Sequence, residues 1–299
     1  MGIIGNAILS IIKIIVGFIS GSMAVLGDGI DSASDILTSI ITLYTAKMVN
    51  RPPNLEYAYG YKRADTVASK VLAFIIFFAG AQLAISTINK LIDGHTGEIP
   101  GKIALVVTVI SIFGKIFLAR YQMSIGKKTD SSMLRANGKN MQNDVIISLT
   151  VLIGLGLTFI LKIPIADILT AGGVSIYIMY TAFQIFLESN KELLDGIEDT
   201  SIYEKIYKAA SSVKGVFNPH RIRVRKMGDQ YLISLDIEVD SNICVKESHK
   251  LCHSVEENIN HTIPAVYDIR VHAEPLGDKH PDEVYGIGAC DLPNCYKKK

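Results

Sequence analysis

The sequence has almost no net charge, few cysteines and no recognisable secretory signal. Its 30 basic residues nearly balance its 29 acidic ones, which leaves +1 at pH 7. This balance argues against nucleic acid as a partner, because nucleic-acid-binding surfaces need an excess of basic residues. No basic residue precedes the first apolar run and no convincing cleavage site follows it, so we expect no secretory leader. The cysteines lack zinc-finger spacing, and we expect thiols in a reducing compartment at Cys244, Cys252, Cys290 and Cys295.

Apolar residues, in contrast, are abundant. They make up 49% of the chain, and the mean hydropathy of +0.31 is high for a soluble protein. A helix needs about 20 apolar residues to cross a bilayer, where its backbone must satisfy its own hydrogen bonds. We therefore predict a membrane α-helical protein with six transmembrane helices, over residues 3–20, 22–46, 66–92, 100–122, 140–161 and 164–188.

Basic residues are concentrated in one set of the connecting loops. The opposite loops, "SGS", "DGHTGEIPGK" and "LKIP", are nearly bare of them. Because basic loops stay in the cytoplasm, we predict a multi-pass protein of the cell (inner) membrane with both termini cytoplasmic. The residues concerned are Lys47, Arg51, Lys62, Arg63, Arg120, Lys127, Lys128, Arg135, Lys139 and Lys191.

The pattern turns soluble near the C-terminus, in the order helix, strand, strand, helix, strand. Two stretches that alternate with period two flank Gly228-Asp229, which indicates a hairpin. This order is typical of a small α+β domain (αββαβ, ferredoxin/metallochaperone-like), with helices on one face of a three-stranded sheet. Such domains often mediate dimerisation. We predict a transmembrane domain over 1–195, a cytoplasmic domain over 196–276 and a tail without periodicity over 277–299.

Three aspartates interrupt the second apolar helix, in the run "GDGIDSASDI". Asp31 and Asp35 are spaced i, i+4 and share one helix face, and Asp28 lies one turn earlier. A carboxylate at mid-bilayer costs about 2.5–3.5 kcal/mol, so such groups face a bundle interior, water or a partner charge. The fifth helix carries a matching pair, Asn140 and Asp144. Two facing helices with two oxygen ligands each predict a four-ligand metal cage.

The predicted cage has no basic residue within the spans to balance it apart from Lys13, which makes a divalent cation its natural counter-ion. In the alternative interpretation, Asp28 and Asp35 cap helix ends or line water near them, and Lys13 is their partner. We expect Lys13 itself to be a snorkelling or packing residue.

These features resemble the cation diffusion facilitator family. The resemblance rests on "GSMAVLGDGIDSASDIL", the NxxxD of the fifth helix, six spans and a C-terminal domain ending "VHAEP". It implies a homodimer in the lipid bilayer that exports divalent metal ions in exchange for protons, by alternating access. The transport site that it implies consists of Asp31, Asp35, Asn140 and Asp144, with Asp28 as an accessory residue.

Two departures from the family pattern bear on the transported ion. Zinc-transporting members usually have His where this chain has Asn140. An all-oxygen site suits hard ions such as Mn²⁺, so Mn²⁺ is favoured, while Zn²⁺, Fe²⁺, Co²⁺ and Cd²⁺ stay open. Zinc members often have a cluster of Asp and His in the loop between the second and third helices. Here Tyr57 and Tyr61 stand where the histidines would be, so we expect no strong metal site in this loop and a solvated Glu56.

The resemblance also assigns residues outside the spans. Asp236, His249, His272 and Glu274 fall at or near family positions for a regulatory metal in the cytoplasmic domain, unless they are ordinary surface residues. Arg63 and Asp195 match a charge pair at the dimer interface, with two solvated charges as the alternative. The tail residues His280, Asp282, Cys290 and Cys295 are candidates for a soft metal.

Two other classes of function compete with a transporter. Paired aspartates also occur in intramembrane aspartyl proteases, but "GDGID" lacks the GxGD context of those enzymes and Asn140 would have no role. We therefore expect no enzyme and no catalytic cofactor. A membrane-tethered metal sensor is the second alternative, although no segment looks like a signalling output domain.

Overall fold

The computed structural model describes residues 2–92, 99–128, 132–277 and 285–292. It divides into two compact units. The first comprises residues 1–48 and 67–188, and the second comprises residues 49–66 and 189–299. The loop after the second helix therefore belongs with the C-terminal unit, a grouping that the sequence does not predict.

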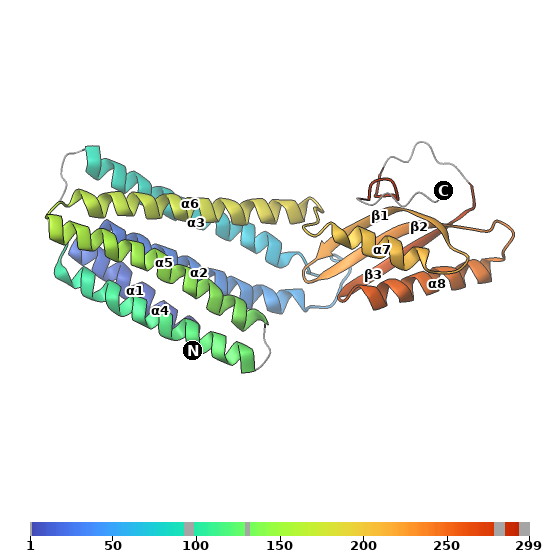
Figure 1. Cartoon of the computed structure of the whole chain (residues 1–299), viewed down its shortest axis with the longest axis horizontal. Helices are drawn as coiled ribbons and strands as arrows, with labels where there is room; N and C mark the ends of the chain where they lie inside the picture. The colour runs from blue at the N-terminus through green and yellow to red at the C-terminus, as the bar shows by residue number, and fades with distance from the viewer. Residues whose placement is uncertain (1, 93–98, 129–131, 278–284, 293–299) are drawn as a thin grey trace. The chain divides into compact units, whose positions relative to one another are not determined.

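Six long helices form the membrane part, which confirms the predicted number, and they run side by side (Figure 1). Most extend a few residues beyond the predicted spans. Their bounds are α1 Gly2–Ser20, α2 Met23–Val49, α3 Ala64–Ile92, α4 Lys102–Lys128, α5 Ser132–Leu161 and α6 Ile165–Leu193.

The first unit is apolar outside, and its interior contains polar side chains besides a hydrophobic core. Phe18, Phe78 and Ile160 are exposed, whereas Thr108 and Ser148 are fully buried. This distribution suits a lipid environment, since hydrocarbon replaces water as the solvent of the outer face. Among the described residues, four helices are long and apolar enough to cross a membrane: Ala64–Ile92, Lys102–Ile125, Gly138–Leu161 and Ile165–Leu193. The apolar part of α1 is shorter, and the aspartates of α2 lower its hydropathy.

Helices α1 and α2 form a hairpin whose backbones approach closely at Gly29. A Cβ on Gly29 would lie 2.8 Å from Ile14 Cγ1 and 3.0 Å from the Ile14 nitrogen. Small residues permit such contacts between membrane helices. The Ser10 hydroxyl donates to the Gly29 carbonyl oxygen at 3.0 Å. This packing brings the middle of α1 against the aspartate-bearing part of α2.

The second unit contains α7 (Ser201–Ser211), β1 (Phe217–Met227), β2 (Gln230–Val239), α8 (Val245–Thr262) and β3 (Val266–Pro275). The sheet order is β1-β2-β3, with β1 and β2 antiparallel and β2 and β3 parallel. Both helices pack on one face, over a core that includes Ile206, Leu235 and Ile259 (Figure 1). The predicted αββαβ fold is thus confirmed.

Part of the predicted tail is built into this unit. Ile287 pairs with Ile222 of β1 through two backbone hydrogen bonds, each 3.0 Å from nitrogen to oxygen. Gly286 has φ +89°, and a Cβ there would lie 2.6 Å from backbone atoms of Arg221, so only glycine fits. Leu292 is buried. The candidate tail ligands His280, Asp282 and Cys295 lie outside the described residues, while Cys290 is an exposed thiol.

Candidate metal site

Three carboxylates gather inside the first unit. Asp31 and Asp35 from α2 and Asp144 from α5 each offer one oxygen, and these three atoms lie within 4.8 Å of one another. The i, i+4 spacing places both α2 carboxylates on one face, as the sequence predicts. One oxygen of each residue, Oδ2, is buried without a hydrogen-bond partner among the described residues. Asp31 and Asp35 are half-buried and Asp144 is buried, so carboxylates this close repel one another unless protons or a cation neutralise them.

Asn140 is the fourth residue of the predicted transport site. It lies one turn before Asp144 on α5, but its side chain is exposed. The structure therefore brings together the three carboxylates predicted for the transport site, and Asn140 stays a predicted ligand. Helical spacing relates Asn140 to Asp144 but does not determine how deeply each side chain is buried.

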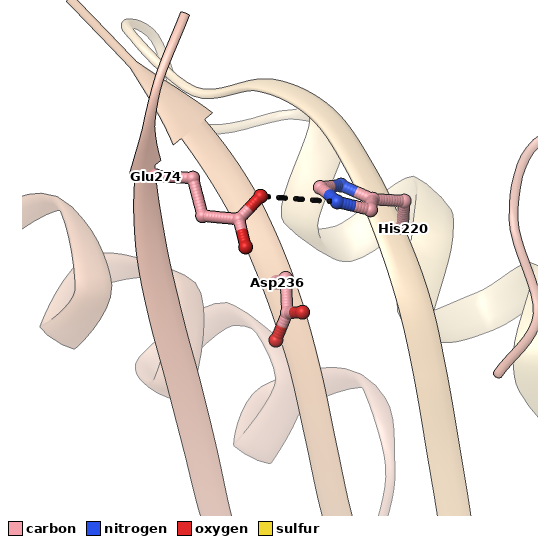
Figure 2. A group of neighbouring side chains, drawn as sticks. All are labelled: His220, Asp236 and Glu274. Carbon is pink, nitrogen blue, oxygen red and sulfur yellow. Dashed lines mark ion pairs between the residues drawn. The ribbon is translucent and has the colours of Figure 1, made fainter. Parts of the chain in front are cut away.

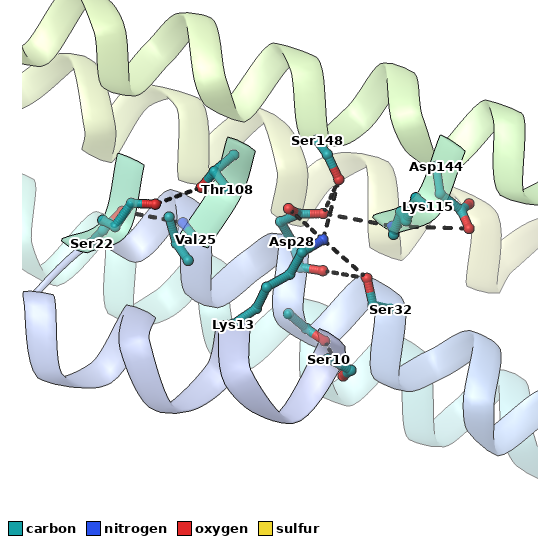
Figure 3. A network of polar contacts seen from close by, with 12 residues as sticks. Ser10, Lys13, Ser22, Val25, Asp28, Ser32, Thr108, Lys115, Asp144 and Ser148 are labelled. Atoms are coloured by element: carbon teal, nitrogen blue, oxygen red, sulfur yellow. Dashed lines mark hydrogen bonds and ion pairs between the residues drawn. The ribbon is translucent and has the colours of Figure 1, made fainter. Parts of the chain in front are cut away.

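Asp28 lies in a separate arrangement (Figure 3). Its Oδ2 pairs with Lys13 Nζ at 2.7 Å, and both side chains are fully buried. Ser148 donates to Asp28 Oδ1 at 2.8 Å, and Lys13 donates to Ser148 at 3.2 Å and to Ser32 at 3.4 Å. Lys13 is therefore the partner of Asp28, as in the alternative interpretation. It does not snorkel towards a membrane surface, because its side chain is fully buried.

The expectation that Lys13 is the sole basic residue within the spans is wrong. Lys115 of α4 is fully buried, and its Nζ lies 3.9 Å from Asp28 Oδ1 and 4.0 Å from Asp144 Oδ2 (Figure 3). The available signal was a single lysine inside the apolar run "IFGKIFLA". Such a residue needs a buried partner, because it lies too far from either helix end to reach water.

A second group of candidate ligands lies on the sheet of the C-terminal unit. One ligand atom from each of His220, Asp236 and Glu274 lies within 4.8 Å of the others (Figure 2). Asp236 on β2 is opposite His220 on β1 and His272 on β3. His220 Nε2 lies 3.2 Å from Glu274 Oε2. Asp236 and Glu274 are both buried.

This group differs from the predicted cytoplasmic set. It contains Asp236 and Glu274, while His272 is largely exposed with its Nε2 3.8 Å from Glu274 Oε1. His249 is exposed on α8. Leu235 and Ile237 face the helices, so Asp236 between them points to the opposite face of the sheet, away from α8. His220 was not predicted, because two register shifts around it break the alternation of β1.

An arginine already supplies positive charge to this group. The Arg221 guanidinium pairs with Asp236 and lies 2.6 Å from Glu274 Oε1. Burial opposes its charge, but a hydrogen bond with Tyr285 and the two carboxylates raise the pKa of Arg221 above its ordinary value. The Tyr285 ring lies 5.9 Å from the guanidinium carbon. The tail segment therefore covers the residue that bridges the two carboxylates.

Arg63 and Asp195 lie together in the second unit. Their side chains form an ion pair, and each is 33% exposed. Asp195 Oδ2 also forms an ion pair with Arg225, whose Nε lies 3.0 Å away. The two residues are therefore partners within one chain rather than isolated solvated charges.

Comparisons with known proteins agree with this organisation. Residues 1–194 match the cation efflux transmembrane domain, and residues 199–276 match the cytoplasmic domain of cation efflux proteins. An uncharacterized transporter of Methanocaldococcus jannaschii is 31% identical over 87% of this chain and 91% of its own length. The cation-efflux pump FieF of Salmonella typhi is 30% identical over 89% and 88%, and the manganese efflux system protein MneS of Bacillus subtilis is 28% identical over 91% and 92%. The chain belongs to the cation diffusion facilitator family, whose members are cation efflux transporters and not enzymes.

Proposed function

We propose that this protein exports a divalent metal cation from the cytoplasm, with Mn²⁺ as the preferred ion, in exchange for protons. One observation carries the proposal. Asp31, Asp35 and Asp144 hold carboxylate oxygens within 4.8 Å of one another inside a helical bundle whose outer face is apolar. Carboxylate oxygens are ligands of hard divalent cations, and ionisable residues within membrane spans mark ion pathways.

The choice of Mn²⁺ rests on the donor atoms. The three carboxylates offer only oxygen, and Asn140, the proposed fourth ligand, would add an amide oxygen. Hard ions such as Mn²⁺ suit these donors, whereas imidazole suits Zn²⁺. The similarity to a manganese efflux protein supports the same choice. Zn²⁺, Fe²⁺, Co²⁺ and Cd²⁺ are the alternative cargoes.

Proton exchange follows from the same ligands. Metal binding requires deprotonated carboxylates, so protons and metal compete for one site. In the proposed cycle, the site loads metal while it faces the cytoplasm and exchanges it for protons after the bundle opens to the other side. The distribution of basic residues supports cytoplasmic termini, since basic loops stay inside.

We further propose a homodimer that assembles through the cytoplasmic domain and is stabilised by the Arg63–Asp195 pair. Arg63→Asp should then weaken dimerisation in detergent, and adding Asp195→Arg should restore it. Failure of the second change to rescue the first would contradict this role. We also keep Asp236, His249, His272 and Glu274 as the proposed regulatory metal ligands. A metal at Asp236 and Glu274 would first have to displace Arg221 from the two carboxylates, and His249 would have to reach it from α8, on the other face of the sheet.

The ion choice is tested by uptake into proteoliposomes with the cytoplasmic face outward and an acidic lumen. Mn²⁺, Zn²⁺, Fe²⁺ and Co²⁺ are offered in turn to the wild type and to Asn140→His. We expect the wild type to prefer Mn²⁺, and the variant to shift towards Zn²⁺. Flux that is indifferent to the pH gradient would contradict proton exchange. Metal binding without flux of any ion would favour the membrane-tethered sensor.

A further inference from the structure

The buried network of the first unit contains two lysines to which the transport reaction assigns no role. Lys13 and Lys115 are both fully buried, on α1 and α4. A buried ammonium group is costly unless it is paired. Lys13 is paired, because it lies 2.7 Å from Asp28 and donates to two hydroxyl groups.

Lys115 is placed differently. Its Nζ makes no hydrogen bond among the described residues. It lies between two carboxylates, 3.9 Å from Asp28 Oδ1 and 4.0 Å from Asp144 Oδ2 (Figure 3). These distances exceed those of a hydrogen bond, so Lys115 acts on both groups through its charge. One of the two, Asp144, belongs to the proposed transport site, and the other does not.

The charges of this region match one divalent cation. When a metal ion binds, its ligands are deprotonated. With all six groups ionised, Asp28, Asp31, Asp35 and Asp144 carry four negative charges, and Lys13 and Lys115 carry two positive charges. A net charge of two negative units remains around Asp31, Asp35 and Asp144, which each place one oxygen within 4.8 Å of the others. Without Lys115 three would remain, which one divalent ion does not balance.

We propose that Lys115 is a specificity-determining residue, a fixed counter-cation that sets the charge of the transport site to match one divalent ion. The inference rests on the proposed function, because it assumes that Asp31, Asp35 and Asp144 bind the transported ion. Lys115 repels the ion that these carboxylates attract. It therefore weakens binding enough for release, and it disfavours ions of higher charge.

The test replaces Lys115 in the full-length protein and measures metal binding and metal transport together. In Lys115→Met, we expect the Kd for Mn²⁺ in detergent to fall about tenfold, because a repelling charge a few ångströms away is lost. Coulomb energy scales with ion charge, so the Kd for La³⁺ should fall roughly thirtyfold. Mn²⁺ uptake into proteoliposomes should become slower although binding is tighter. Damage to the fold alone would weaken binding of both ions.

Three further variants serve as matched controls. Lys115→Arg keeps the charge and should keep the wild-type ratio of La³⁺ to Mn²⁺ affinity. Lys127→Met makes the same change at an exposed position of the same helix and should have no effect. The double variant Lys115→Met/Asp28→Asn restores the net charge, since Lys13 then opposes the three remaining carboxylates. Its Mn²⁺ affinity should return towards that of the wild type.

An unchanged or weaker Mn²⁺ affinity in a folded Lys115→Met protein would overturn the proposal, as would an unchanged ratio of the two ions. If this variant does not fold, Lys115→Gln makes the same test with a polar side chain. If neither folds, Asp28→Asn tests the charge count from the other side, with a Kd for Mn²⁺ expected to rise about tenfold. Failure of the wild type to bind Mn²⁺ would instead refute the proposed function. If the wild type binds Mn²⁺ and the variants bind it with the same affinity, this inference alone is refuted.

Discussion

Asp28→Asn should destabilise the first unit more than Lys13→Met, although the two residues form one ion pair. Both side chains are fully buried, and Lys13 Nζ lies 2.7 Å from Asp28 Oδ2. Removing one partner of a buried pair costs about 3–5 kcal/mol, because the other charge is left without compensation. In Asp28→Asn, Lys13 keeps only the hydroxyl groups of Ser32 and Ser148, so the full cost applies.

Lys13→Met leaves Asp28 better supported. Ser148 still donates to Asp28 at 2.8 Å, and Lys115 lies 3.9 Å away. A hydrogen bond to a charged group is worth about 1.5–3 kcal/mol, so we expect a loss of roughly 2 kcal/mol. The double variant Asp28→Asn/Lys13→Met strands no lysine at this position and should be more stable than Asp28→Asn alone.

The assay is the apparent Tm of the full-length protein in detergent, at constant detergent and protein concentration. With about 2–4 °C per kcal/mol, Asp28→Asn should lower Tm by roughly 6–20 °C and Lys13→Met by about 4–8 °C. Equal losses for the two single variants, or strict additivity in the double variant, would refute the assignment of Asp28 as the residue that holds both lysines.

Three further predictions concern packing and the second charged group. Gly29→Ala should lower Tm by several degrees, because the added Cβ would lie 2.8 Å from Ile14 Cγ1. Gly156→Ala should leave Tm unchanged, because no atom lies within 4 Å of its added Cβ. Equal effects of the two changes would contradict close packing of α1 and α2. Gly286→Ala should remove the hydrogen-exchange protection of the Ile222 and Ile287 amides, while Gly288→Ala, whose Cβ would lie 3.7 Å from Asp291 Oδ2, should preserve it. Arg221→Gln leaves the two buried carboxylates, Asp236 and Glu274, without their cation, so it should destabilise the second unit by about 3 kcal/mol. In this variant Mn²⁺ should bind the two carboxylates and raise Tm. An unchanged Tm with and without Mn²⁺ would contradict the bridging role of Arg221.

The parts of this molecule that local spacing determines were predictable. Six apolar blocks separated by polar loops predicted six helices, and i, i+4 aspartates in α2 predicted two carboxylates on one face. Asp144 was predictable for the same reason, since a charge in an apolar helix must face the interior. The αββαβ order followed from hydrophobic periodicity around one hairpin signal.

Four features depend on contacts that local patterns do not reveal. Lys115 finds its carboxylates on two other helices, so nothing in its own apolar run identifies them. His220 joins Asp236 and Glu274 through a bulged register in β1, where alternation fails. Asn140 has the right spacing from Asp144, but its burial depends on how α5 packs against its neighbours. The return of Ile287 to β1 involves a single bridge, which is too short to leave a periodic signal.

The central claim is that the carboxylates of α2 and α5 carry a divalent cation through the bundle. The most direct measurement is the initial rate of Mn²⁺ uptake into proteoliposomes by the wild type, by Asp144→Asn and by Asp229→Asn, a matched change at an exposed turn residue. We predict rapid uptake by the wild type and by Asp229→Asn, and loss of most of the rate in Asp144→Asn at equal protein incorporation. Uptake by Asp144→Asn at the wild-type rate would contradict the account.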